Sequence, residues 1–330
     1  MKIFNKVLNG VAISLLIYFG IALGLIYSQN PHELSGQGGL DFTRQTLVNA
    51  ADPAPLETYT ARDGATLYAR HYGAKFADAP LLVLVHGSGW HGLQFDGLAR
   101  GLADDAEIIV PDLRGHGAHP VRRGDVDYIG QLEDDIADLI EQNRKPDQQV
   151  ILAGHSSGGG LVIRFAAGEH AQMIDKAVLL APFLKYNAPT TRENSGGWAQ
   201  PLTRRIIGVS MLNQFNIFRW NHLWVIQFNF PKSVLTGPLG HTATNAYSFR
   251  MNTSFAPRGD YLADVAALPE FLLVVGKKDE AFIADEYEPL MSAVNSKGQY
   301  LLVDEVSHLD IVNAGETKAA MRAFILNAKE

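Results

Sequence analysis

The chain has 330 residues, of which 47% are hydrophobic and 19% are charged, and its net charge is −7. This composition predicts a folded chain with a substantial core, and the missing basic excess gives no support to nucleic-acid binding. Cysteine is absent, which excludes disulfides, thiolate metal ligands and cysteine nucleophiles, so any nucleophile is an oxygen or a nitrogen atom.

The N-terminal residues 7–27 form an apolar run that follows Lys2 and Lys6. As a helix, this run would span roughly 30 Å, the thickness of the hydrocarbon core of a bilayer. We therefore expect residues 1–28 to be a membrane anchor. A cleaved signal peptide is the alternative, because the small-x-small triplet at 22–24 lies inside the run. The lysines favour a cytoplasmic N-terminus, which places the remaining chain on the non-cytoplasmic side, or releases it as a secreted or periplasmic protein after cleavage.

Residues 29–55 are polar and rich in turn residues, and we expect them to form a linker between the membrane and a folded core. Strand and helix patterns alternate beyond this linker. Asp63-Gly64 predicts a hairpin turn. Buried strands are predicted at 81–85, 106–110, 150–153, 176–180, 271–275 and 300–303, and a last helix at about 312–326. This alternation predicts a mostly parallel sheet with helices on both faces, with its functional site at the carboxyl ends of the strands.

One strand runs directly into the sequence Gly154-His155-Ser156-Ser157-Gly158, which is followed by a helical pattern. Glycines on both sides of a tight strand-to-helix turn allow backbones to approach where a Cβ atom would clash. Such a turn exposes the side chain of Ser156 above a helix N-terminus, whose backbone N–H groups stabilise negative charge. Ser156 is therefore the candidate nucleophile.

A serine hydroxyl needs a base that takes its proton, and a histidine base needs an acid that fixes its tautomer. His308 follows the predicted strand at 300–303, and Asp279 follows the predicted strand at 271–275. Both residues are thus expected at the site, in the chain order serine, acid, histidine. Glu280 and Asp310 are the alternatives to Asp279.

An ester-cleaving serine also needs backbone donors for the oxyanion. The N–H groups of Ser157 and of Ser88, in the loop His86-Gly87-Ser88-Gly89, are the candidates. We expect neither a metal nor a cofactor, because His116 and His119 are too sparse for a metal site.

The strand and helix alternation stops between residues 184 and 258. We expect this segment to be a lid inserted between two parts of the core, residues 56–183 and 259–330. Aromatic residues are dense in the lid, and we expect Phe215, Phe218, Trp220 and Trp224 to line an apolar acyl pocket or to dip into the bilayer interface. The alternative is that these aromatic side chains form the packing core of the lid itself.

Five motifs occur in order along the chain: His86-Gly87-Ser88-Gly89, Asp112-Leu113-Arg114-Gly115-His116-Gly117, Gly154-His155-Ser156-Ser157-Gly158, Gly276-Lys277-Lys278-Asp279 and Ser307-His308. Together they resemble the α/β-hydrolase superfamily, most closely its lysophospholipase and monoacylglycerol-lipase-like branch of serine hydrolases. The resemblance implies an α/β-hydrolase fold with an eight-stranded core sheet, and hydrolysis of a small or lipid-like ester through an acyl-enzyme. An acyltransferase and a non-catalytic membrane-tethered binding protein are the alternatives.

Overall fold

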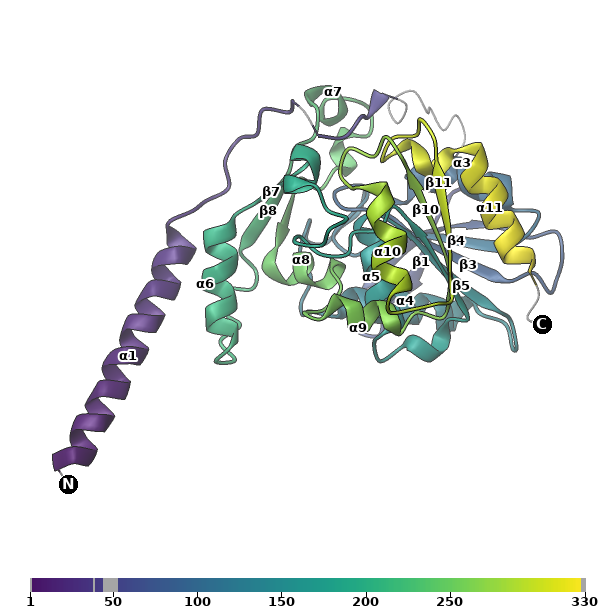
Figure 1. Ribbon diagram of the computed structural model, residues 1–330. Helices are drawn as coiled ribbons and strands as arrows, with labels where there is room; N and C mark the ends of the chain where they lie inside the picture. The colour runs from purple at the N-terminus through teal and green to yellow at the C-terminus, as the bar shows by residue number, and fades with distance from the viewer. Residues whose placement is uncertain (1, 38, 44–52, 328–330) are drawn as a thin grey trace.

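The computed structural model describes residues 2–37, 39–43 and 53–327. Its central sheet has the strand order β1-β2-β4-β3-β5-β6-β10-β11 (Figure 1). The strands are β1 (Leu56–Thr60), β2 (Thr66–Tyr72), β3 (Leu81–Val85), β4 (Glu107–Asp112), β5 (Val150–His155), β6 (Lys176–Leu180), β10 (Glu270–Gly276) and β11 (Gly298–Val303). Within the described part of this sheet, the pairs β1–β2 and β2–β4 are antiparallel and the other pairs are parallel. The predicted fold, a mostly parallel eight-stranded sheet, is thus confirmed.

Helices cover both faces of this sheet, because the central strands are apolar on both sides. All residues of β3, β5 and β6 are buried. On one face α3 (Asp96–Leu102) packs against α11 (Gly315–Leu326). On the other face α5 packs against α4 and α9; these helices are α4 (Gln131–Asn143), α5 (Ser157–Ala166) and α9 (Tyr261–Ala266), with α10 (Tyr287–Ser292) beside α9 (Figure 1). The last helix begins three residues later than expected, because Asp310–Asn313 form a 3-10 turn.

Residues 184–258, which we call the lid, contain a second, antiparallel sheet with the strand order β7-β8-β9. The strands are β7 (Ala199–Pro201), β8 (Trp224–Phe228) and β9 (Ala246–Ser248), and the helices are α6 (Thr203–Asn213), α7 (Lys232–Leu235) and α8 (Phe249–Phe255). The lid contacts the loop that follows β3, where Thr244 N–H donates to Gly89 O over 2.8 Å. The boundaries expected for the lid and for the two parts of the core stay a prediction.

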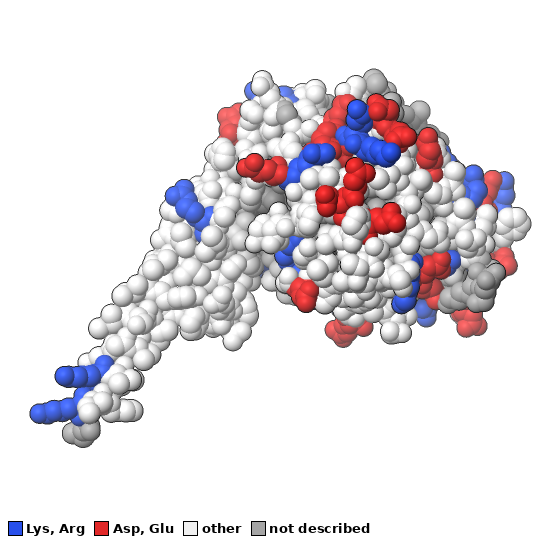
Figure 2. Space-filling view, in the orientation of Figure 1, with Lys and Arg blue, Asp and Glu red and all other residues white. Residues whose placement is uncertain are grey.

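The apolar N-terminal run forms helix α1 (Lys2–Tyr27), which is long and apolar enough to cross a membrane. It extends away from the folded core (Figure 1), and Figure 2 shows basic side chains at its free tip. The helix carries no acidic residue. The structure thus contains the helix expected for an anchor.

The described part of the expected linker is bound to the lid rather than surrounded by solvent. The backbone of His32 exchanges two hydrogen bonds with the side chain of Gln227 in β8, at 3.0 and 2.7 Å. Farther along, Gly36 N–H donates to Asn229 Oδ1 over 2.9 Å, and Asn229 Nδ2 donates to Gln37 O over 2.8 Å. Residues 28–37 and 39–43 therefore pack along the lid, because amide side chains of the lid satisfy their extended backbone. Residues 44–52 of the linker lie outside the described residues.

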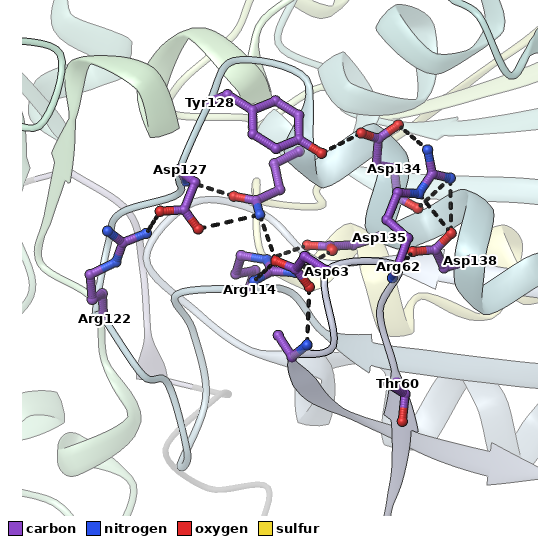
Figure 3. Close-up of polar contacts among 12 residues, drawn as sticks. Thr60, Arg62, Asp63, Arg114, Arg122, Asp127, Tyr128, Asp134, Asp135 and Asp138 are labelled. Carbon is purple, nitrogen blue, oxygen red and sulfur yellow. Dashed lines mark hydrogen bonds and ion pairs between the residues drawn. The ribbon is translucent and has the colours of Figure 1, made fainter.

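The loop after β4 is fixed by ion pairs that join three separate parts of the chain (Figure 3). Arg114 pairs with Asp63 in the β1–β2 turn over 3.0 Å and with Asp135 in α4 over 2.7 Å. Asp135 is 2% exposed in the fold. Burial raises the pKa of Asp135 to about 6, although the hydrogen bond from Arg114 acts in the opposite direction. This network fixes the loop after β4, which carries His116 and lies close to the candidate site.

Candidate active site

Ser156 lies between β5 and α5, at the tight turn that the glycine pattern predicts. Its φ of +56° falls in a region that residues other than glycine rarely adopt. The glycines permit the close packing that holds this conformation. A Cβ atom at Gly154 would overlap the carbonyl of Gly158, and one at Gly158 would overlap the carbonyls of Val85 and His86. The turn thus presses α5 against the end of β3 and leaves Ser156 at the edge of the sheet.

His308 and Asp279 form a buried pair at the same edge of the sheet, in the loops after β11 and β10. His308 Nδ1 lies 2.7 Å from Asp279 Oδ2, and the two residues are 1% and 2% exposed. Because a carboxylate oxygen accepts hydrogen bonds, Nδ1 carries the proton and Nε2 keeps its lone pair. This is the tautomer that a histidine base requires.

The backbone fixes the carboxylate of Asp279 in place. Its second oxygen, Oδ1, accepts from the N–H groups of Ala281 and Phe282 over 2.8 and 2.7 Å. Glu280, one of the alternatives, accepts instead from the backbone N–H of His308 over 2.9 Å. The structure therefore brings Asp279, rather than Glu280, to the imidazole ring.

Ser88 and Ser157, the expected oxyanion donors, both border the space at Ser156. A Cβ atom at Gly87 would lie 3.1 Å from the Cβ atom of Ser156, so the loop after β3 runs directly beside the turn. Ser157 is the first residue of α5, where backbone N–H groups have no acceptor within the helix. Both residues thus border the space beside Ser156, and their role as oxyanion donors stays a prediction.

A buried chain of hydrogen bonds holds the loop after β3, and no local pattern along the chain predicts it. His116 Nδ1 lies 3.0 Å from the carbonyl of Arg114, and its Nε2 lies 2.5 Å from the hydroxyl of Tyr247 in β9. The carbonyl can only accept, so Nδ1 carries the proton and the Tyr247 hydroxyl donates to Nε2. The Tyr247 oxygen then accepts from Gly89 N–H over 2.6 Å. Burial lowers the pKa of His116 well below its usual value, which keeps this acceptor neutral.

His155, the neighbour of Ser156, holds the backbone of His308. Its Nε2 lies 2.9 Å from the His308 carbonyl, and its Nδ1 lies 3.3 Å from the amide nitrogen of Gln94. Burial lowers the pKa of His155 well below its usual value. A neutral ring that donates from Nε2 and accepts at Nδ1 satisfies both contacts. His155 thus links the turn at Ser156 to the loop of His308.

Two cavities meet at Ser156, and both also contact Ser88 and Trp198. The first contains His308 and is further lined by Leu40, Phe42, Gly87, Trp90, Gln94, His155, Leu309 and Val312. The second is mostly apolar and is further lined by Ser157, Phe183, Ser195, Ala199, Ile226, Phe228, Tyr247, Asn252, Phe255, Ala256, Ala281 and Phe282. Ser156 therefore has a separate space on each of two sides.

Several of these lining residues were not foreseen. Leu40 and Phe42 come from the segment expected to be a linker, and the Phe42 ring packs 5.6 Å from the Trp198 ring and 5.8 Å from the Trp90 ring. Trp90 directly follows the glycine-rich loop after β3, so its position along the chain was a usable signal. No local pattern marks Phe42 or Trp198.

The four lid aromatics expected near substrate do not line either cavity. They are Phe215, Phe218 and Trp220, on the loop after α6, and Trp224, at the start of β8. This part of the lid turns toward α1 instead: the Phe215 ring lies 5.3 Å from Tyr18 and 5.2 Å from Phe19. Trp220 Nε1 donates to the hydroxyl of Tyr27 over 3.0 Å. Aromatic density along the sequence does not reveal which neighbour the rings meet.

The chain matches a family model over residues 78–309, described as serine aminopeptidase, S33. The monoglyceride lipase of Mus musculus is 30% identical over 128 residues, which cover 38% of this chain and 42% of that protein. The matched stretches span less than half of the length of such curated relatives.

Solved structures extend the likeness of the fold to nearly the whole chain. A soluble variant of monoglyceride lipase from Saccharomyces cerevisiae gives a TM-score of 0.64 at 16% identity, covering 86% of this chain and 98% of that chain. A membrane phospholipase A, described as a bacterial virulence factor, gives a TM-score of 0.58 at 16% identity and covers 99% of this chain and 100% of that chain. At such identities the likeness shows the fold alone.

Proposed function

Because the chain belongs to the α/β-hydrolase superfamily, in the family described as serine aminopeptidase S33, we propose that it hydrolyses carboxylic esters through Ser156. The observation that carries this proposal is the buried pair of His308 and Asp279, in which His308 lines the same cavity as Ser156. In this function His308 is the base and acid, and Asp279 is the group that orients it.

The reaction proceeds in two halves. His308 Nε2 takes the proton of the Ser156 hydroxyl while the oxygen attacks the acyl carbon, and the N–H groups of Ser88 and Ser157 stabilise the oxyanion. His308 then gives the proton to the leaving alcohol, and an ester bond joins the acyl group to Ser156. Water, deprotonated by His308, attacks this acyl-enzyme. The bond between the acyl carbon and the Ser156 oxygen then breaks, His308 returns the proton to that oxygen, and the acid is released.

Each of the two cavities is assigned one part of the substrate. His308 must reach the leaving oxygen to protonate it, so the alcohol part occupies the cavity that His308 lines. The acyl chain then occupies the other cavity, whose wall includes the apolar side chains of Ile226, Phe228 and Phe255. An apolar cavity of this kind favours a hydrocarbon acyl chain.

An ester fits these cavities better than a peptide with a free N-terminal amine. Within the described part of the chain, the residues that line the two cavities include no aspartate or glutamate. A buried ammonium group without a carboxylate partner is strongly disfavoured. We therefore place the substrate among small or lipid-like esters, with α1 as the membrane anchor and the remaining chain on the non-cytoplasmic side.

Covalent labelling of the full-length protein tests the proposed function. A fluorophosphonate probe is expected to modify one residue, Ser156, with the adduct located by peptide mass spectrometry. Esters of increasing acyl length, added as competitors, should slow labelling according to how well they fill the apolar cavity. If the folded protein carries no adduct at Ser156, it is a binding protein rather than a serine hydrolase.

Tyr247 offers a test of the buried chain that holds the oxyanion loop. Tyr247→Phe keeps the ring but removes both hydrogen bonds, so Gly89 N–H loses its acceptor. Misplaced backbone donors are expected to lower kcat by ~10- to 100-fold while KM changes little. The matched control is Tyr186→Phe, because Tyr186 is 78% exposed. A wild-type kcat for Tyr247→Phe would show that the chain does not position the oxyanion donors.

A further inference from the structure

Helix α1 and lid helix α6 pack side by side (Figure 1). Ala22 and Ile26 of α1 are completely buried in this contact. The helices approach closely at Gly208, where a Cβ atom would lie 2.5 Å from the Ala22 carbonyl oxygen. Arg205 Nε also donates to the Ile26 carbonyl over 3.2 Å. Small residues at such crossings allow backbone contact, so the end of α1 and the lid are joined as one unit.

The two helices run in opposite directions. Arg205, near the start of α6, contacts the end of α1, whereas Gln214, just after α6, accepts from the Tyr18 hydroxyl over 3.0 Å. The residues that follow α6 therefore lie beside the middle of α1. We call residues 214–223 the α6–β8 loop; its Phe215 packs on Tyr18 and Phe19.

The length of α1 sets the depth of this loop in a bilayer. Most side chains between Lys6 and Tyr18 are apolar and exposed, as in Val11 (52%), Ile13 (58%) and Leu16 (72%), and need hydrocarbon around them. The helix rises ~18 Å from Lys6 to Tyr18, against a hydrocarbon core ~30 Å thick. With Lys6 at one boundary, Tyr18 lies ~10 Å inside the other, and a tilt of the helix would bury it more deeply.

The surface of the lid beside α1 has the composition expected at this depth in a bilayer. Phe215 and Phe218 of the α6–β8 loop are 45% and 56% exposed, and Ile207 on α6 is 47% exposed. Polar residues such as Asn216 and Arg219 alternate with the aromatics, as is usual at the boundary between headgroups and acyl chains. Figure 2 shows few charged side chains along α1 and the adjoining lid, whereas charges of both signs crowd the core.

We propose that the α6–β8 loop is embedded in the leaflet through which α1 leaves the bilayer, so that the lid makes a second membrane contact. The partner is the phospholipid bilayer itself. β8 begins directly after this loop, and its residues Ile226 and Phe228 line the apolar cavity at Ser156. The cavity is thus held next to the lipid surface. This inference goes beyond the proposed hydrolysis: it rests on the proposed anchoring by α1 and not on ester cleavage.

Site-specific fluorescence in vesicles tests the depth of the loop. Because the chain has no cysteine, Phe218→Cys gives one labelling site in the full-length protein for an environment-sensitive nitrobenzoxadiazole dye. After reconstitution into phosphatidylcholine vesicles, the dye is expected to lose most of its emission to a nitroxide on the lipid acyl chain near the headgroup. It should also resist quenching by iodide in the water.

Two further single-cysteine variants serve as controls. Leu326→Cys is a matched site, because Leu326 is 59% exposed at the end of α11, on the side of the molecule away from α1 (Figure 1). Ile13→Cys reports whether α1 itself lies in the bilayer. Lipid quenching at positions 13 and 218 but not at 326 supports the proposal. Quenching at position 13 alone overturns the proposal. The absence of quenching at position 13 also overturns it, because the depth of the loop follows from the insertion of α1. Emission does not depend on ester cleavage, so this result is separate from that of the labelling of Ser156.

Discussion

Ser156→Ala is expected to lower kcat for ester hydrolysis by about 10⁴- to 10⁶-fold. The substitution removes the oxygen that bonds to the acyl carbon, and no cysteine exists in the chain to replace it. The oxyanion donors are backbone groups and remain, so a residual rate above that in water should persist. Initial rates with a chromogenic short-chain ester measure the effect.

The control for this variant is a serine elsewhere on the protein. Ser233→Ala removes an exposed hydroxyl from α7 and is expected to leave kcat unchanged. Circular dichroism of both variants checks that they fold. Undiminished hydrolysis by folded Ser156→Ala protein would contradict the assignment of the nucleophile.

The features that the sequence predicts well are those that depend on neighbours along the chain. The apolar strands and the turn at Gly154-His155-Ser156 follow local rules, because burial on both faces demands continuous apolar runs and tight turns demand glycine. The positions of His308 and Asp279 were also predictable. Each residue follows a late strand, and the ends of parallel strands meet at one edge of the sheet.

The features that the sequence does not predict depend on contacts between distant segments. Phe42 reaches the first cavity because residues 28–37 and 39–43 lie along the lid, where amide side chains such as that of Asn229 bind their backbone. A turn-rich, polar stretch has the same composition whether it is solvated or docked. Likewise, an acyl pocket was one of the two places expected for Phe215, but the antiparallel packing of α6 on α1 puts its ring against Tyr18.

These long-range contacts join the parts of the protein that the proposed function needs. β9 supplies Tyr247 to the oxyanion loop, β8 supplies a wall of the apolar cavity, and α6 joins the lid to α1. A change in the lid can therefore reach the chemistry by two routes: through the shape of the cavity, or through the position of Gly89. The two routes differ in kinetics, since the first alters KM for long acyl chains and the second alters kcat for every ester.

Asp279→Asn is expected to lower kcat by about 10⁴-fold. The carboxylate of Asp279 accepts a hydrogen bond from the protonated Nδ1 of His308 over 2.7 Å. This leaves Nε2 of His308 free to take the proton of Ser156. An asparagine can turn its amide nitrogen toward Nδ1 and so stabilise the opposite tautomer, in which Nε2 carries the proton and cannot act as a base. Binding of substrate should change little, so KM stays close to the wild-type value.

Glu280→Gln is the matched control, because it makes the same chemical change one residue away. One carboxylate oxygen of Glu280 accepts from the backbone N–H of His308 over 2.9 Å, and the other accepts from that of Asp41 over 3.3 Å. The single oxygen of a glutamine can keep the bond to His308. We therefore expect its kcat to fall by less than about tenfold, as for a hydrogen bond that changes from charged to neutral. Equal losses in the two variants would mean that the orientation of His308 depends on its backbone anchor as much as on its carboxylate, and the role given to Asp279 would be wrong.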